Sequence, residues 1–185
     1  ALFRKRAIMQ PDAPALTGVT TAGTFTLSYQ ALALRVARLA SALRGAGVQR
    51  GDRIALWSEN DPAYLELELA AAHLGAIVAC LNWRLTDAEQ LHCIQLVSPV
   101  MLVVSPRFQP ALAQLDHGVP QVRELGLSWD AWRDAAEPAA PDDAVDPEDG
   151  LVILYTSGTT GLPKGALISH RAMVARAMVF STEYG

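Results

Sequence analysis

The sequence predicts an α/β fold: a mostly parallel β-sheet with helices packed on its faces. Short apolar segments alternate with segments of helical periodicity along the chain, and this alternation is typical of parallel strands joined by crossover helices. Hydrophobic residues make up 51% of the 185 residues and charged residues only 18%. That balance excludes a disordered chain and supplies enough apolar side chains for a substantial core.

The first strand and helix are predicted between residues 24 and 45. Residues 24–29 (TFTLSY) are mostly β-branched or aromatic, which favours a strand. Ser28 is a suitable helix N-cap, and from Gln30 the apolar side chains recur with helical spacing until Gly45. One face of this helix carries Leu32, Val36, Leu39 and Leu43.

Three further strands are expected in the middle of the chain. They are the short apolar segments 52–58, 76–81 and 100–104. Asp61 followed by Pro62 is typical of a helix N-cap and first helical residue, and predicts a helix over 62–74. A capping box in the later TDAE sequence predicts a helix over 87–98. We expect the three strands to be neighbours in one parallel sheet, with these helices as right-handed crossovers.

The second half of the chain divides at an acidic segment. A helix near 108–115 and a strand near 121–125 would continue the alternation. Residues 137–149 contain three prolines and six acidic residues but no basic residue, which predicts an exposed linker; a site for a metal or a basic partner is the alternative. We therefore expect one α/β subdomain over 1–150 and the start of a second over 151–185, whose first segment LVILY is the most hydrophobic strand candidate.

Charge and cysteine content exclude several classes of protein. The net charge is −4 without a lysine-rich tract, which gives no support to nucleic-acid binding or to a membrane-surface role. The longest apolar stretch, 69–81, is shorter than the about 20 residues that a transmembrane helix needs. Cys80 and Cys93 lack the spacing of a metal site, so we interpret them as reduced, buried thiols and expect a cytoplasmic protein.

Residues 155–165, YTSGTTGLPKG, have the composition of a phosphate-binding loop. They contain three glycines, one lysine and four aliphatic hydroxyl side chains. Glycine lets a ligand approach the backbone N–H groups closely, and hydroxyl and N–H donors suit phosphate oxygens. An ordinary surface turn is the alternative, but turns use fewer such residues and draw on Asn and Asp as well.

The spacing in this loop excludes two common nucleotide motifs. A Walker A loop needs Gly-Lys-Ser/Thr before a helix, whereas Leu162-Pro163 separates Gly161 from Lys164 here. The pattern also differs from GxGxxG. Residues 166–169 predict another strand, with Ser169 as the cap of a helix that begins near His170. The loop is therefore expected to join two strands.

Five segments together resemble the adenylate-forming (AMP-binding) superfamily, which includes acyl- and aryl-CoA synthetases, peptide-synthetase adenylation domains and luciferases. They are YTSGTTGLPKG (155–165), PDAPAL (11–16), GDRIALWSEN (51–60), LGAIVACLNWRLTDAE (74–89) and GALISHRAM (165–173). The resemblance implies the large N-terminal domain of such an enzyme, without its small mobile C-terminal domain. Because family members are much longer, it also implies a fragment that is inactive alone.

The resemblance also implies an activity. In the family a carboxylic acid attacks the α-phosphate of Mg-ATP, giving an acyl-adenylate and pyrophosphate, and coenzyme A then takes the acyl group. Carried onto this sequence, Ser157, Thr159 and Thr160 donate hydroxyl hydrogen bonds to phosphate, while Gly158 and Gly161 give access to the backbone. Lys164 is the catalytic cation, and Thr156 is a possible Mg²⁺ contact. A non-catalytic phosphate-binding module and a peptide-synthetase adenylation domain are the alternatives.

The remaining notable residues have ordinary structural interpretations. We expect His73 to be a packed, hydrogen-bonded core residue and His92 not to form a metal site. His170 is expected at a helix start without a catalytic role, and the four tryptophans as scattered packing residues. In the family, the apolar strand over 151–155 and the helix after Ser169 pack against parts encoded downstream. We therefore expect an exposed apolar surface at this end, and hence self-association or poor order after residue 165.

Overall fold

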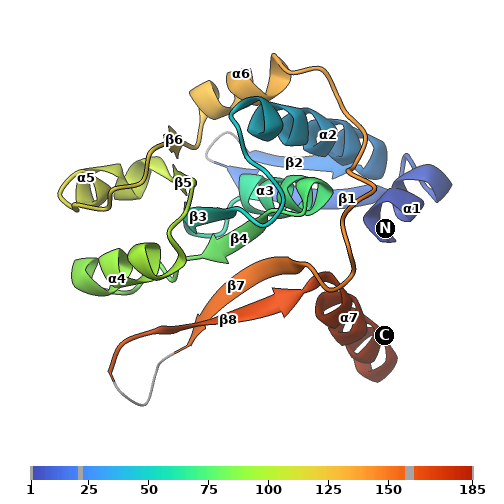
Figure 1. Cartoon of the computed structure of the whole chain (residues 1–185). Helices are drawn as coiled ribbons and strands as arrows, with labels where there is room; N and C mark the ends of the chain where they lie inside the picture. The colour runs from blue at the N-terminus through green and yellow to red at the C-terminus, as the bar shows by residue number, and fades with distance from the viewer. Residues whose placement is uncertain (1, 21–22, 157–160, 185) are drawn as a thin grey trace.

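The computed structural model describes residues 2–20, 23–156 and 161–184, which form an α/β fold (Figure 1). The helices are α1 (Leu2–Met9), α2 (Tyr29–Gly45), α3 (Pro62–Leu74), α4 (Asp87–Val97), α5 (Gln109–Leu112, preceded by the 3₁₀ turn η1, Pro106–Phe108), α6 (Leu127–Asp134) and α7 (His170–Tyr184). The strands are β1 (Pro14–Thr20), β2 (Gly23–Ser28), β3 (Arg53–Trp57), β4 (Ile77–Cys80), β5 (Met101–Val104), β6 (Val122–Glu124), β7 (Gly150–Thr156) and β8 (Lys164–Ser169).

Six of the strands form one sheet in the order β6-β5-β3-β4-β7-β8. The first five run parallel, and only β8 pairs antiparallel, with β7. β3 lies between β4 and β5, so the three central strands predicted from the sequence are neighbours in one parallel sheet, and this prediction is confirmed. Helices α3 and α4 connect them, as expected.

Side chains alternate between the two faces of the sheet and build two cores. On β3, Ile54 and Leu56 belong to the larger core, which packs against α2, α3 and α6. The intervening Ala55 and Trp57 belong to a second core with residues of α4 and α5. Successive side chains of a strand point to opposite faces, and helices cover both faces of this sheet. The central strands are therefore apolar throughout.

The helix ends confirm the predicted capping signals. The Ser28 hydroxyl accepts a hydrogen bond from the N–H of Ala31, and the Asp61 carboxylate accepts one from Ala63. Thr86 and Glu89 form both halves of a capping box at the start of α4. Gly75 ends α3 with a φ of 67°, in the left-handed region that favours glycine.

The strand predicted over 24–29 is confirmed as β2, but its pairing differs from that of the central strands. It does not continue the parallel alternation but forms an antiparallel hairpin, β1–β2, in a separate two-stranded sheet. The reason is the short connection between Thr20 and Gly23, because strands joined so closely can only pair antiparallel. The sequence analysis also missed α1 and α6, and the predicted helix near 108–115 is reduced to η1 and α5.

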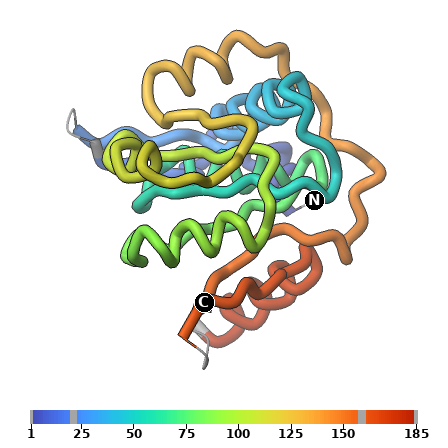
Figure 2. The backbone as a smooth tube through the Cα atoms, turned by 60° about the vertical axis from the view of Figure 1, so that its left-hand side comes forward, coloured from blue at the N-terminus to red at the C-terminus, as the bar shows by residue number. Residues whose placement is uncertain are grey.

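The acidic linker 137–149 forms neither helix nor strand and is mostly exposed, as predicted. Figure 2 shows it on the outside of the molecule between α6 and β7. Among the contacts that hold it, the N–H of Asp142 donates to the His73 carbonyl at 2.8 Å, the N–H of Arg171 donates to the Pro147 carbonyl at 2.8 Å, and Arg50 forms an ion pair with Asp149 at 2.7 Å. The hydrogen bond from Arg50 holds the pKa of Asp149 below its usual value.

The C-terminal end of the structure presents an apolar surface, as expected from the sequence. Its exposed apolar side chains are Leu154, Leu162, Leu167, Met178, Val179 and Phe180. Exposed apolar side chains that no other part of the chain covers favour association. Among the described residues, no helix is both long and apolar enough to span a bilayer.

We expect the 185-residue chain to self-associate through this surface. Sedimentation velocity over a wide concentration range should show a rising mean mass. The substitution Met178→Lys, which places a charge on the exposed face of α7, should move the association to higher concentration. A chain that stays monomeric throughout this range would contradict the prediction.

Candidate functional site

The candidate site lies where β7 ends and β8 begins. In the antiparallel pair, Thr156 is opposite Lys164 and Tyr155 is opposite Gly165, so the two ends of the loop 155–165 lie side by side. β7 is parallel to β4, and its carboxyl end therefore lies at the same edge as those of the central strands. In open α/β sheets, ligands bind outside this edge.

Three of the seven predicted site residues are described. Thr156 and Lys164 are exposed at the two strand ends, and Gly161 has a φ of 94°, a conformation that favours glycine. Within the described parts of the chain, Lys164 forms no ion pair, so its ammonium group is available to an anion. The other four, Ser157, Gly158, Thr159 and Thr160, lie outside the described residues, and their roles stay predictions.

Helix α4 contacts both ends of this loop. The Tyr155 hydroxyl donates a hydrogen bond to the Cys93 carbonyl at 2.8 Å, and burial raises the pKa of Tyr155, which keeps this donor protonated. The His92 Nε2 lies 3.1 Å from the Pro163 carbonyl oxygen. A carbonyl only accepts hydrogen bonds, so Nε2 must carry the hydrogen. From the sequence, His92 was predicted only not to form a metal site, and no local pattern indicates its contact with Pro163.

Gly165 allows the hairpin to pack closely on the sheet. A Cβ at this position would lie 2.9 Å from Cγ2 of Ile153 and 3.9 Å from Cδ2 of Leu96. The first distance is shorter than real Cβ contacts, so any larger residue would push the start of β8 outward. The glycine after Lys164 therefore lets β8 lie close to Ile153 of β7.

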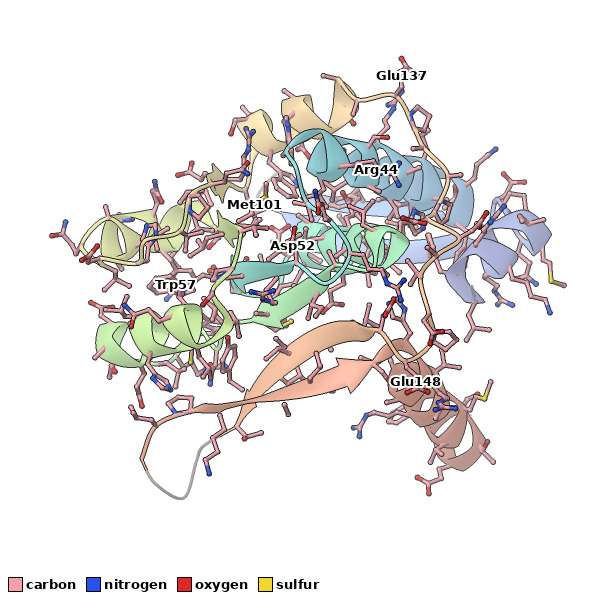
Figure 3. All side chains as sticks on the ribbon, in the orientation of Figure 1. Arg44, Asp52, Trp57, Met101, Glu137 and Glu148 are labelled. Carbon is pink, nitrogen blue, oxygen red and sulfur yellow. The ribbon has the colours of Figure 1, made fainter. Side chains whose placement is uncertain are left out.

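An aromatic stack with cations lies beside the same edge of the sheet. Trp57, at the end of β3 and labelled in Figure 3, stacks on Phe108 with ring centroids 5.5 Å apart. Trp83 also stacks on Phe108, and the guanidinium groups of Arg84 and Arg107 lie 4.1 and 5.2 Å from the Trp83 ring. These two tryptophans therefore have the packing role that the sequence predicted, as parts of one stack.

His73 also differs from its prediction. It is half-buried, and its Nδ1 has no hydrogen-bond partner among the described residues. It lines a cavity of about 290 Å³ between α1, α2 and the linker, together with Phe3, Arg4 and Pro141. The prediction of a hydrogen-bonded core residue was wrong because α1 and the linker cover α3 without a polar group at Nδ1.

We expect His73 to make stability depend on pH. Burial lowers its pKa from 6.5 to about 4. Between these values the unfolded chain binds a proton that the folded chain does not, so the free energy of unfolding falls as the pH drops from about 6.5 to about 4. Urea unfolding at several pH values should show this fall, and His73→Gln should reduce it. Parallel pH curves for the two proteins would contradict the prediction.

The remaining titratable candidates lie outside the loop. His170 begins α7, at the opposite end of β8 from Lys164, and burial lowers its pKa. Cys80 and Cys93 are buried free thiols, as predicted, and burial raises their pKa values to about 12 and about 11. In the described ranges no cluster of three or more His, Cys, Asp or Glu residues is suited to a metal ion.

The fold and the loop together define a class of protein: an α/β domain with a glycine- and hydroxyl-rich loop and a cation at the carboxyl edge of its sheet. The chain belongs to the AMP-binding enzyme family, whose model matches residues 3–184.

Two curated relatives are similar to this chain. A feruloyl-CoA synthase from Amycolatopsis is 41% identical over 170 residues, which cover 90% of this chain and 32% of that relative. The fatty acid–[acyl-carrier-protein] ligase ScoC from Streptomyces coeruleorubidus is 35% identical over 154 residues, covering 81% and 29%. The chain thus spans about a third of the length of the curated relatives it matches.

Two solved structures share its fold. The inhibitor-bound N-terminal domain of FACL13 from Mycobacterium tuberculosis has a TM-score of 0.89 and 27% identity, covering 98% of this chain and 46% of that one. ATP-bound MatB from Rhodopseudomonas palustris has a TM-score of 0.81 and 29% identity, covering 98% and 37%. The predicted fold class, from the N-terminal domain of an adenylate-forming enzyme, is therefore confirmed.

Proposed function

We propose that this chain is part of an AMP-forming acid–thiol ligase. The enzyme would convert a carboxylic acid and ATP into an acyl-adenylate and pyrophosphate, and then pass the acyl group to coenzyme A. The observation that carries this proposal is the pairing of Thr156 with Lys164, which closes the base of the loop and leaves Lys164 without an ion pair among the described residues. The similarity to a feruloyl-CoA synthase and to ATP-bound MatB supports it.

The chemistry explains why a cation belongs at this place. A carboxylate oxygen of the acid attacks the α-phosphorus of ATP, and the bond from that phosphorus to the bridging oxygen breaks. The electron pair leaves with pyrophosphate, so negative charge builds on the β- and γ-phosphates. Lys164, the hydroxyl groups of Ser157, Thr159 and Thr160 and the backbone at Gly158 and Gly161 would stabilise this charge.

The loop also fits a magnesium ion that arrives with the nucleotide. Mg²⁺ prefers oxygen ligands and usually keeps several waters beside substrate phosphates, with one or two protein groups. The exposed Thr156 hydroxyl is a hard oxygen donor at the loop base, so Thr156 would hold the ion there. When bound, Mg²⁺ would neutralise phosphate charge.

The chain alone is expected to lack the complete reaction. It spans about a third of its curated relatives, so we infer that residues for the acid, the adenine and coenzyme A lie elsewhere in a longer protein. Within the chain, we keep the division into 1–150 and 151–185 as a proposal. We also infer a cytoplasmic location, because both cysteines are free thiols and the cytosol keeps thiols reduced.

ATP–pyrophosphate exchange tests the proposal. The full-length protein, mixed with Mg-ATP and a panel of aromatic and aliphatic carboxylic acids, should incorporate labelled pyrophosphate into ATP only when an accepted acid is present. A protein that binds ATP but gives no acid-dependent exchange would instead be a non-catalytic nucleotide-binding module.

A second candidate differs in the thiol that accepts the acyl group. The similarity to ScoC favours an acyl-carrier-protein thiol, as in a peptide-synthetase adenylation domain or a carrier-protein ligase. The two candidates share the adenylation step and separate in the next one. Acyl transfer from the adenylate to free coenzyme A, compared with transfer to a phosphopantetheinyl carrier protein, decides between them.

A further inference from the structure

The loop end of the β7–β8 hairpin extends beyond the sheet that holds it. The pairing of β7 with β4 ends where Cys80 lies opposite Leu154. The pairing of β7 with β8 continues for two more residues, to Thr156 and Lys164. Among the described residues β8 is an edge strand, so on its other side no described strand is its neighbour in the sheet. Sheet hydrogen bonds alone therefore do not fix the position of Lys164.

Helix α4 supplies the missing contacts from two consecutive residues. At the β7 end of the loop, the Cys93 carbonyl accepts the hydrogen bond of Tyr155. At the β8 end, His92 donates to the carbonyl of Pro163. Both are long-range contacts, with sequence separations of 62 and 71 residues. The capping box fixes the start of α4, and its core residues Cys93 and Ile94 are fully buried, so these two groups belong to a firmly held element.

We propose that His92 is a positioning residue for Lys164, and that His92 and Tyr155 form a clamp that holds both ends of the loop on α4. This inference rests on the proposed function, because it assigns to the clamp the placement of the cation that meets the leaving pyrophosphate. Pro163 precedes Lys164 directly, so a fixed Pro163 carbonyl limits where the Lys164 backbone can lie. His92 acts through Pro163 and does not touch substrate.

The test compares three variants of the full-length protein. His92→Leu removes the donor, His92→Gln keeps an N–H donor, and Gln95→Leu is the matched control because Gln95 is exposed on the same helix. Without the hydrogen bond to Pro163, Lys164 is held less well at the place where it meets the leaving pyrophosphate. His92→Leu should therefore lower kcat for pyrophosphate release by roughly 2- to 10-fold. Thioester formation from synthetic acyl-adenylate should not change.

Hydrogen exchange gives a readout that does not depend on activity. In His92→Leu the backbone amides of Gly161, Leu162, Lys164 and Gly165 should exchange faster than in the wild type, while those of β3 and β5 keep their protection. His92→Gln should restore most of both the rate and the protection, and Gln95→Leu should behave as the wild type. Tyr155→Phe, which loses only the hydroxyl, should also speed exchange in this segment.

Three outcomes would overturn the clamp. Wild-type rates and protection in His92→Leu would show that the contact has no influence on the loop. Equal slowing of both half-reactions, together with a lower free energy of unfolding, would show that His92 only supports the fold. Unchanged hydrogen exchange at the backbone amides of this segment in His92→Leu would show that His92 does not hold this end of the loop. If the wild-type protein itself forms no pyrophosphate, the proposed function fails, and the exchange data alone decide the clamp.

Discussion

Replacing Lys164 by alanine should slow adenylate formation by about 10- to 150-fold, since a charge-assisted contact is worth about 1.5–3 kcal/mol. The side chain is exposed and has no ion pair within the described residues, so its removal should not disturb packing. The loss therefore falls on the transition state in which charge builds on pyrophosphate. Thioester formation from synthetic acyl-adenylate begins after pyrophosphate has left and should be nearly unaffected.

The two half-reactions measured side by side give the decisive comparison for Lys164. Lys5→Ala is the matched control, because Lys5 is an exposed lysine on α1. Lys164→Arg should recover part of the rate, since it keeps the charge but not the compact ammonium geometry. Equal slowing of both half-reactions in Lys164→Ala would show that this residue is structural, and the proposed role in the loop would be wrong.

Replacing Glu66 by alanine should lower the free energy of unfolding by about 3–5 kcal/mol, the usual cost of removing one partner of a buried ion pair. Glu66 is fully buried on α3 and accepts hydrogen bonds from Arg35 of α2 at 2.7 Å and from Arg133 of α6 at 3.2 Å. Arg133 is itself 1% exposed and keeps its ion pairs with Asp130 and Asp134, so the substitution removes the only one of its three carboxylate partners among the described residues that is fully buried. Urea unfolding measures the loss.

An exposed ion pair provides the comparison for Glu66. Arg107, on the turn η1, pairs with Glu59 at 3.2 Å with 61% of its side chain exposed, and its guanidinium also lies 5.2 Å from the Trp83 ring. Arg107→Ala removes both exposed contacts and should cost only about 0.5–2 kcal/mol. Glu66→Gln, which keeps the shape and one acceptor, serves if Glu66→Ala does not fold, and it should lose less than the alanine variant. Equal losses in Glu66→Ala and Arg107→Ala would contradict the account of the buried pair.

The central strands and helices were predictable because their signals are local. Asp61-Pro62 and the capping box at Thr86 mark helix starts, and the apolar runs of β4 and β5 match strands buried on both faces. α6 was missed because one of its two buried residues is Arg133. A buried cation breaks the apolar periodicity on which the prediction depends, and its charge is balanced in the fold by ion pairs with Glu66, Asp130 and Asp134.

The residues of the candidate site were predictable from the sequence, but the contacts that hold them in place were not. The glycines, hydroxyl groups and lysine of the loop 155–165 stand together in the sequence. The contact of His92 with Pro163 joins positions 71 residues apart, and no local pattern indicates it. The aromatic stack likewise joins Trp57, Trp83 and Phe108 from three separate connections at one edge of the sheet. Such contacts depend on which strands are neighbours in the sheet, and local sequence patterns do not show that order.

Transfer of an oxygen isotope tests the central claim most directly, because it follows the atom that attacks ATP. The full-length protein is given an accepted carboxylic acid labelled with ¹⁸O in its carboxylate, together with ATP, Mg²⁺ and coenzyme A, and the products are analysed by mass spectrometry. An AMP-forming ligase attacks the α-phosphorus with a carboxylate oxygen, and thiol attack at the acyl carbon then leaves that oxygen on AMP. The account predicts one ¹⁸O atom in AMP and none in pyrophosphate. Label in inorganic phosphate with ADP as the nucleotide product, or unlabelled AMP beside a thioester product, would contradict it.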